Sequence, residues 1–292
     1  MPRPDVPPVV ADLDWSADRA RALGERVLGL YEGLLAEIAT GPATPQVTPE
    51  AVRAAVALEV PDEPLGDEEL LRHLQAILDN SLRPGSGGFF AYITGGGTVP
   101  GALADLLASG LNANVGGWVL SPAATEIELQ LVRWLAARFG LPAGAGGSLA
   151  SGGSLANLSA LKLARDRAAA TARVDGVTAG PPLTVYASEE SHFTIDRAAD
   201  VLGLGERAVR KVAVDERLRM RPDDLERLLA ADLAAGARPA AIVATAGTTG
   251  TGAIDPLGEL ADIAARVGAC SHSSQRPQFS WLWQRRPPAK RP

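Results

Sequence analysis

The chain has 292 residues, 46% of them hydrophobic, and a formal net charge of −6. This composition is typical of a globular protein rather than a disordered one, and the length predicts one large domain with appendages. The negative charge argues against a general nucleic-acid-binding protein, because phosphate backbones require a basic surface.

Membrane and metal signals are absent from the sequence. No apolar run reaches membrane-spanning length, and the proline-rich start MPRPDVPPVV lacks the apolar block of a secretory signal, so we expect a cytoplasmic protein. The single Cys270 cannot form an internal disulfide, and the three histidines show no Cys/His zinc spacing. We therefore expect no metal site.

Amphipathic helices are predicted in the first part of the chain. Ser16 is expected to cap a helix that runs to about Ala39, and further helices are expected over 49–58 and 67–82. Together they predict a helical N-terminal appendage, residues 1–84, which either packs within the chain or serves as a dimer arm.

A glycine-rich segment, residues 85–101, follows the appendage and contains the aromatic Tyr92. Such a segment either lines a pocket or forms a surface loop whose aromatic rings pack into the core. Helices are then predicted over 100–111 and about 125–139, the second introduced by the start signals in SPAATE.

The stretch Leu149 to Arg165, LASGGSLANLSALKLAR, runs from a glycine-rich turn into a helical pattern. Gly152 and Gly153 allow a sharp turn, and Ser154 is expected to cap the helix. The first turn of such a helix suits a phosphate, because its N–H groups are unpaired and the helix dipole is positive there. Neither nucleotide pattern, G-x-x-x-x-G-K-[ST] or G-x-G-x-x-G, is present. An ordinary strand-to-helix connection and a non-nucleotide phosphate site both remain open.

From residue 183 onward, strand and helix patterns alternate. Strands are predicted at 183–188, within 207–214 and at 240–245, and helices at 222–233 and from a cap at Asp255 and Pro256 to about 266. This alternation predicts a largely parallel sheet with helices on its faces. Because loops at the carboxyl ends of parallel strands converge, we expect one shared crevice for the segments 151–157, 187–194 and 244–256.

The C-terminal segment breaks this pattern. The α/β layout requires a further strand after Gly268, and the sequence predicts none. Residues 270–292 contain four prolines and five basic residues without an acid, a charge of +5 against −11 for the rest of the chain. A partner-binding extension is one interpretation, but the abrupt change favours a truncated or frame-shifted end.

Together with FFAYITGGGTVPGALADLL and SPAATEIELQLVRWLAARFGLP, these motifs resemble, in order and spacing, the group II pyridoxal-phosphate-dependent amino acid decarboxylases. This family includes the aromatic amino acid, glutamate and diaminobutyrate decarboxylases. The resemblance covers roughly residues 16–269. It implies an α/β fold, namely the N-terminal part of a fold-type I transferase-like domain with a mostly parallel sheet flanked by helices. The domains would be a helical appendage (1–84), a partial cofactor-binding domain (85–269) and a basic tail (270–292).

The resemblance also implies roles for individual residues. Gly153 and Ser154 would hold the phosphate of pyridoxal 5'-phosphate, and His192, in the SHFT motif, would stack on the pyridine ring and assist proton handling. Thr248 and Thr249, in the GTT stretch, would contact the cofactor. The substrate pocket would include Tyr92, Ile93 and Thr94.

The chemistry of the family joins the substrate amine to the cofactor, releases CO2 from Cα and stores the electron pair in the protonated ring. It uses an aspartate beside the ring nitrogen, in an HVDAA-type strand, and a Schiff-base lysine in a later HK pair. Neither motif is present here, and we assign that role to none of the three lysines, Lys162, Lys211 and Lys290. We therefore expect this chain to be inactive by itself.

Three hypotheses follow. The first is an L-amino acid decarboxylase by descent, homodimeric in the intact family member and without nucleic-acid or membrane partners. The second is a non-catalytic regulatory fragment that associates with full-length subunits. The third is another fold-type I enzyme, such as an aminotransferase, because a phosphate turn does not determine which bond is cleaved. The SPAATE and SHFT segments favour the first hypothesis over the third.

Overall fold

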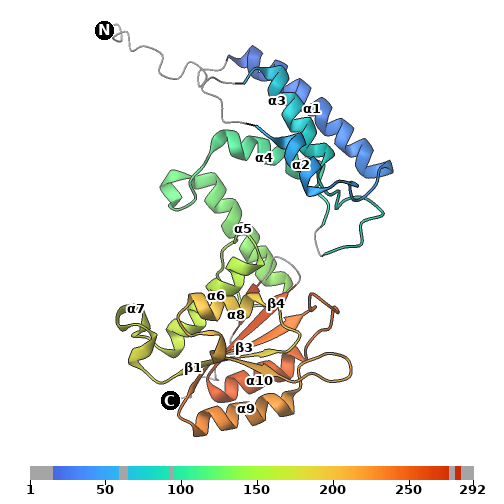
Figure 1. Ribbon diagram of the computed structural model, residues 1–292. Coiled ribbons are helices and arrows are strands. Elements are labelled where there is room, and N and C mark those ends of the chain that lie inside the picture. The colour runs from blue at the N-terminus through green and yellow to red at the C-terminus, as the bar shows by residue number, and fades with distance from the viewer. Residues whose placement is uncertain (1–15, 59–64, 93–94, 276–279, 284–292) are drawn as a thin grey trace, which may run out of the picture. The chain divides into compact units, whose positions relative to one another are not determined.

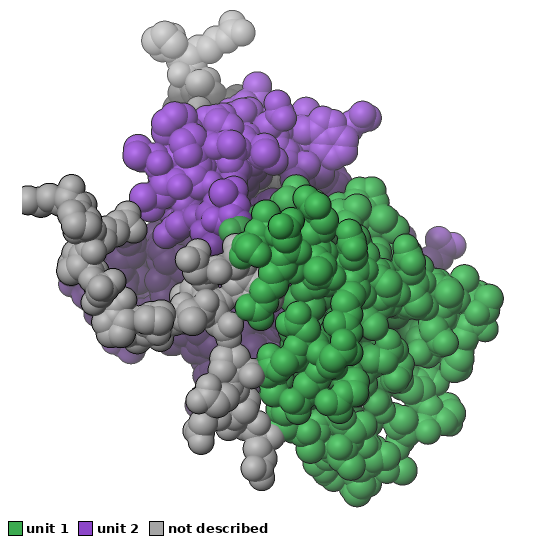
Figure 2. All heavy atoms as spheres, turned by 90° about the horizontal axis from the view of Figure 1, so that it is seen from above, with its two compact units in different colours: residues 1–110 green, residues 111–292 purple. Residues whose placement is uncertain are grey.

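The computed structural model describes four stretches of the chain, residues 16–58, 65–92, 95–275 and 280–283. The chain divides into two compact units, residues 1–110 and residues 111–292, coloured green and purple in Figure 2. No helix in the described stretches is long and apolar enough to cross a membrane. The domain boundaries that we predict from the sequence at residues 84 and 269 stay predictions.

The first unit is helical, as the sequence predicts. Its helices are α1 (Ala17–Thr40), α2 (Pro49–Val56), α3 (Asp67–Asp79) and α4 (Val99–Leu111), whose last residue lies past the unit boundary. Ser16 caps α1 by accepting the amide N–H of Arg19 at 3.2 Å, so the predicted cap is confirmed. Helices α1 and α3 lie side by side (Figure 1), and Arg26 and Glu68 form an ion pair between them at 2.7 Å.

The second unit combines helices with one sheet. Its helices are α5 (Pro122–Arg138), α6 (Gly153–Ala168), α7 (Ala172–Asp175), α8 (Thr194–Val201), α9 (Pro222–Ala234) and α10 (Leu257–Val267), with single 3-10 turns at 118–120, 177–179 and 206–208. Its strands are β1 (Leu183–Ser188), β2 (Val209–Val212), β3 (Arg238–Ala246), β4 (Cys270–Gln275) and β5 (Ser280–Trp283). The predicted helices and strands are confirmed to within a few residues. Helices α7 and α8 are elements that our sequence analysis does not predict.

The strand order is β2-β1-β3-β4-β5. Neighbouring strands among the first four pair in parallel, and β5 pairs with β4 in the antiparallel direction. The largely parallel sheet predicted from the alternating pattern is therefore confirmed. Since β1, β3 and β4 lie side by side at its centre, the segments that follow these strands meet at one edge.

Strand β4 corrects our expectation that no strand follows Gly268. Its sequence, CSHSSQ, has almost no apolar or β-branched residue, so the usual strand pattern is missing. The backbone nevertheless pairs with β3 over six residues, from Ala241 opposite Cys270 to Ala246 opposite Gln275. Backbone ladder bonds do not depend on side-chain type, and pairing with an adjacent strand has overridden the weak local propensity.

Helices cover both faces of the sheet (Figure 1), and two apolar clusters of side chains hold them there. Helices α6 and α8 cover one face, where Leu161 and Ile195 pack with Val185 and Val243. Helices α9 and α10 cover the other, where buried leucine and isoleucine side chains pack with Tyr186. The alternation of Val185 and Tyr186 between the faces is the period-two pattern of a strand buried on both sides.

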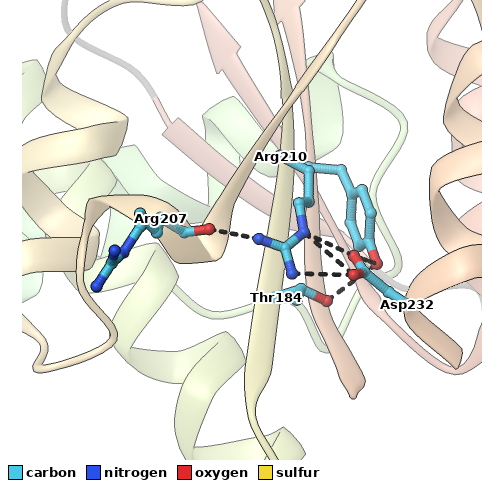
Figure 3. A network of polar contacts seen from close by, with 5 residues as sticks. Thr184, Arg207, Arg210 and Asp232 are labelled. Carbon is cyan, nitrogen blue, oxygen red and sulfur yellow. Dashed lines mark hydrogen bonds and ion pairs between the residues drawn. The ribbon is translucent and has the colours of Figure 1, made fainter. Parts of the chain in front are cut away.

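A partly buried polar network joins β1, β2 and α9 near the amino ends of the strands (Figure 3). The Tyr186 hydroxyl donates to Asp232 Oδ2 at 2.8 Å and accepts the Thr184 hydroxyl at 3.0 Å. Arg210 forms an ion pair with Asp232 at 2.9 Å and also donates to the carbonyl of Arg207. Hydrogen bonding to Arg210 lowers the pKa of Asp232, whereas burial raises the pKa of Tyr186. All partners are paired, so this network has a structural role.

Candidate functional site

Three segments meet at the carboxyl edge of the sheet, as the sequence predicts. The start of α6 contacts the segment after β1 through Asn157, whose Nδ2 donates to Thr194 Oγ1 at 3.0 Å. The turn after β3 lies beside the same segment, because Glu190 Oε2 is 3.9 Å from the position that a Cβ would take at Gly250. Residues far apart in the sequence are thus assembled into one site.

Helix α6 begins at Gly153, two residues earlier than a cap at Ser154 requires, because the N-cap is the residue just before the helix. Gly152 is the N-cap residue, with φ +143° and ψ 168°, and makes no side-chain cap bond. Ser154 is the second residue of the helix and is exposed, so our prediction that it caps the helix is wrong. A helix start that no side chain caps keeps its first N–H groups available to an anion.

His192 lies in the turn between β1 and α8. Its Nδ1 is 2.9 Å from Thr194 Oγ1 and accepts the Thr194 amide N–H at 3.3 Å. The imidazole ring centroid lies 4.2 Å from that of Phe193, which in turn has the Arg197 guanidinium 4.5 Å from its centroid. The histidine predicted from the SHFT motif is therefore held by hydrogen bonds to the start of α8.

The turn after β3 contains the two threonines of the GTT stretch. Thr248 is fully buried; its hydroxyl lies 2.6 Å from Thr251 Oγ1 and accepts the Ala253 amide N–H at 3.1 Å. Thr249 is exposed. These contacts show that Thr248 holds the shape of the turn, whereas Thr249 has the exposure that a ligand contact requires. The cofactor-binding role of both residues stays a prediction.

Asp255 is buried behind this turn, with 3% of its surface exposed. Its Oδ1 accepts the Met220 amide N–H at 2.7 Å, and its Oδ2 accepts the Thr245 amide N–H at 2.6 Å. The carboxylate therefore ties β3 to the loop before α9, and our prediction that it caps α10 is wrong. Burial raises the pKa of Asp255, although the two amide bonds oppose this rise.

The predicted substrate-pocket residues belong to a different part of the chain. Tyr92 lies in the first unit with φ +60°, and its side chain is exposed, with the ring centroid 6.5 Å from that of Phe89. Ile93 and Thr94 lie outside the described residues. The substrate-binding role of all three stays a prediction.

Three residues of the site are missed by our sequence analysis: Asn157, Thr194 and His272. All three are buried, and His272 Nε2 lies 3.1 Å from Asn157 Oδ1. A signal for Asn157 does exist in the sequence. It occupies the same buried helical stripe as Leu161 and Ala164, where a polar side chain requires a hydrogen-bond partner.

The two described lysines are each engaged by an aspartate. Lys162 Nζ lies 2.5 Å from Asp166 Oδ2 within α6, and Lys211 Nζ lies 2.8 Å from Asp196 Oδ2 on α8. Lys290 lies outside the described residues. Neither ion pair includes a member of the His192 hydrogen-bond network.

Comparison with known proteins agrees with this geometry. Residues 49–273 match the pyridoxal-dependent decarboxylase conserved domain. The chain is 32% identical over 253 residues to the aromatic-L-amino-acid decarboxylase of Bacillus atrophaeus. The aligned residues cover 86% of this chain and 51% of that protein. Among solved structures, it is similar to mouse CSAD in apo form (TM-score 0.84, 29% identity) and to Oryza sativa TDC with PLP and tryptamine (TM-score 0.80, 28% identity). These alignments cover 88% and 89% of this chain.

The same comparisons show how much of the relatives is represented. The chain spans about half the length of the curated relatives that it matches, and 55% of each of the two solved chains. The conserved-domain match nevertheless covers most of the 292 residues and includes α6, the His192 turn and the GTT turn. The chain therefore belongs to the pyridoxal-dependent decarboxylase family.

Proposed function

We propose that this chain binds pyridoxal 5'-phosphate and supplies the cofactor-binding part of an L-amino acid decarboxylase, a carboxy-lyase. The observation that carries the proposal is the hydrogen bond between Asn157 and Thr194, which joins the uncapped start of α6 to the turn that holds His192. The helix start that would bind the phosphate is thereby linked to the imidazole of His192, which would stack on the cofactor ring. The similar Oryza sativa structure, which contains PLP, supports the same reading.

The start of α6 fits a phosphate group in its backbone conformation and in its space. At Gly152, φ is +143°, and a Cβ built there has no heavy atom within 4 Å outside its immediate neighbours. Open space therefore lies directly beside the first turn of the helix. Amide N–H groups at Gly153 and Ser154 would bind the phosphate, favoured by the positive end of the helix dipole.

The remaining residues would position the cofactor ring and the groups around it. When bound, pyridoxal phosphate supplies an electron sink for the loss of CO2 from the Cα of an amino acid. His192, held at Nδ1 by Thr194, offers the face of an imidazole for stacking. Thr249 is an exposed residue of the turn after β3 and would contact the cofactor, and Thr248 and Asp255 hold that turn.

Binding of the cofactor is testable on the 292-residue chain. We expect pyridoxal, which lacks the phosphate, to bind at least ~10-fold more weakly than pyridoxal phosphate in equilibrium dialysis, because it forfeits charge-assisted hydrogen bonds. Inorganic phosphate is expected to compete. Borohydride treatment should not trap the site-bound cofactor at Lys162 or Lys211, since neither lysine belongs to the His192 hydrogen-bond network. Equal affinity for pyridoxal and pyridoxal phosphate would contradict the proposal.

We also propose that the chain pairs with a second copy of itself through α4. Leu103, Leu106 and Leu107 follow one face of this helix, and 45%, 67% and 74% of their respective surfaces are exposed. Exposed apolar clusters of this kind are characteristic of interaction surfaces.

Sedimentation equilibrium tests this pairing. We expect a mass twice the 30.2 kDa of the chain, and a dissociation constant at least ~10-fold higher for Leu107→Glu, because burial of one leucine stabilises by about 1.5–3 kcal/mol. Val174→Glu is the matched control, since Val174 is 89% exposed on the short helix α7. A monomeric parent chain, or equal effects of the two substitutions, would rule out this surface.

A further inference from the structure

Four side chains form a continuous hydrogen-bonded chain from β4 to the candidate site. His272 Nε2 lies 3.1 Å from Asn157 Oδ1, Asn157 Nδ2 donates to Thr194 Oγ1 at 3.0 Å, and Thr194 Oγ1 lies 2.9 Å from His192 Nδ1. His272, Asn157 and Thr194 are 0%, 4% and 5% exposed. Because these three side chains are buried, their hydrogen bonds are strong, and leaving one of their polar groups without a partner would cost free energy.

The direction of each hydrogen bond follows from one backbone donor. The Thr194 amide N–H donates to His192 Nδ1 at 3.3 Å, so this nitrogen is an acceptor and carries no proton in the neutral ring. The Thr194 hydroxyl accepts a proton from Asn157 Nδ2 and can therefore donate its own to His192 Nδ1. Asn157 Oδ1 then accepts the Nε2–H of His272. In this arrangement each side-chain bond has one donor and one acceptor, and the Thr194 amide and hydroxyl share the lone pair of His192 Nδ1.

We propose that Asn157 and Thr194 are positioning residues that hold His192 as the neutral tautomer protonated at Nε2. The tautomer follows from the hydrogen bonds alone, whereas its use against a cofactor ring rests on the proposed function. A neutral imidazole with Nε2–H as its donor keeps its Nδ1 occupied within the protein. The orientation of the ring is then set by α6, the same helix that offers the phosphate site.

Nitrogen NMR of the histidine-labelled 292-residue chain tests the tautomer at about pH 8.5, where an ordinary histidine is neutral. We expect His192 to be protonated at Nε2 in the parent chain. Thr194→Val keeps the side-chain shape but removes the hydroxyl, so the Nδ1 resonance should shift, whereas Thr194→Ser should restore the parent resonance. A parent chain protonated at Nδ1, or identical spectra for the valine and serine variants, would overturn the assignment.

Asn157→Asp tests the direction of the chain of bonds. A carboxylate only accepts, so the Thr194 hydroxyl would donate to it and would accept from His192 instead. We expect the ratio of the Nε2–H to the Nδ1–H tautomer to fall by at least ~5-fold. In a chain that already carries Thr194→Val, Asn157→Asp should leave the tautomer ratio of His192 unchanged, because the Thr194 hydroxyl that connects the two residues is absent. An effect of equal size in both backgrounds would contradict relay through Thr194.

Pyridoxal phosphate affinity, measured on the same samples, separates this inference from the proposed function. If the tautomer and the valine–serine difference are found but the cofactor does not bind, the hydrogen-bond assignment stands and the proposed function fails. If the cofactor binds but the valine and serine variants behave alike, the proposed function stands and the positioning role fails. If Asn157→Asp does not fold, the Thr194 pair alone decides the matter.

Discussion

Replacing Gly152 with alanine is expected to weaken pyridoxal phosphate binding by at least ~10-fold. The residue has φ +143° and ψ 168°, a conformation that side-chain-bearing residues adopt at a cost of about 1–3 kcal/mol. A Cβ would also project into the open space beside the first turn of α6, where the phosphate is proposed to bind. The backbone strain and the added Cβ are therefore both expected to weaken pyridoxal phosphate binding.

Gly258→Ala is the matched control for this experiment. Gly258 lies in α10, outside the positive-φ region, and no heavy atom beyond its immediate neighbours lies within 4 Å of a Cβ placed there. Alanine at such a position leaves the cofactor affinity unchanged and the melting temperature equal or higher. Equilibrium dialysis gives the affinity, and circular dichroism shows whether Gly152→Ala is folded. A folded Gly152→Ala that binds as tightly as the parent would show that the start of α6 is not the phosphate site.

Replacing Asp255 with alanine is expected to lower the free energy of unfolding by about 2–6 kcal/mol. The substitution leaves the amide N–H groups of Met220 and Thr245 without their acceptors, and each buried unpaired donor costs about 1–3 kcal/mol. Urea denaturation measures the change. Asp200→Ala, at an exposed position in α8, should change stability by less than ~0.5 kcal/mol. Equal effects of the two substitutions would show that the Asp255 bonds contribute nothing.

Asp255 also gives a pH dependence of defined sign. Burial raises the pKa of the Asp255 carboxyl in the folded state above the ordinary value that it has in the unfolded state. At a pH between these two pKa values, the folded state therefore binds more protons than the unfolded state. The contribution of Asp255 to stability therefore falls as pH rises through this window. Asp255→Asn does not titrate, so the stability of the parent chain relative to this variant should improve as pH falls from about 6 toward about 4. Carboxylates common to both proteins cancel in the comparison, and a difference independent of pH would refute the raised pKa.

The sequence by itself determines the local elements and the family. Periodic apolar residues predict α1, start and end signals predict α9, and short strand-like runs predict β1 and β3, because these patterns arise from the geometry of single helices and strands. The motifs from the glycine-rich segment to the GTT turn are also short stretches of sequence, and their order is enough to identify the family. The conserved-domain match confirms that family. Start signals are less reliable, since Ser154 and Asp255 both look like caps and neither caps a helix.

Only the tertiary structure decides which polar groups meet. His272 and Asn157 are 115 residues apart, and no local pattern predicts that their side chains form a hydrogen bond. Their contact depends on β4, whose polar sequence forms a strand because the backbone of β3 pairs with it. Burial then requires each polar side chain to find a partner. The buried position of Asn157 is predictable from helical spacing, but its partners, and with them the tautomer proposed for His192, follow from the order of strands in the sheet.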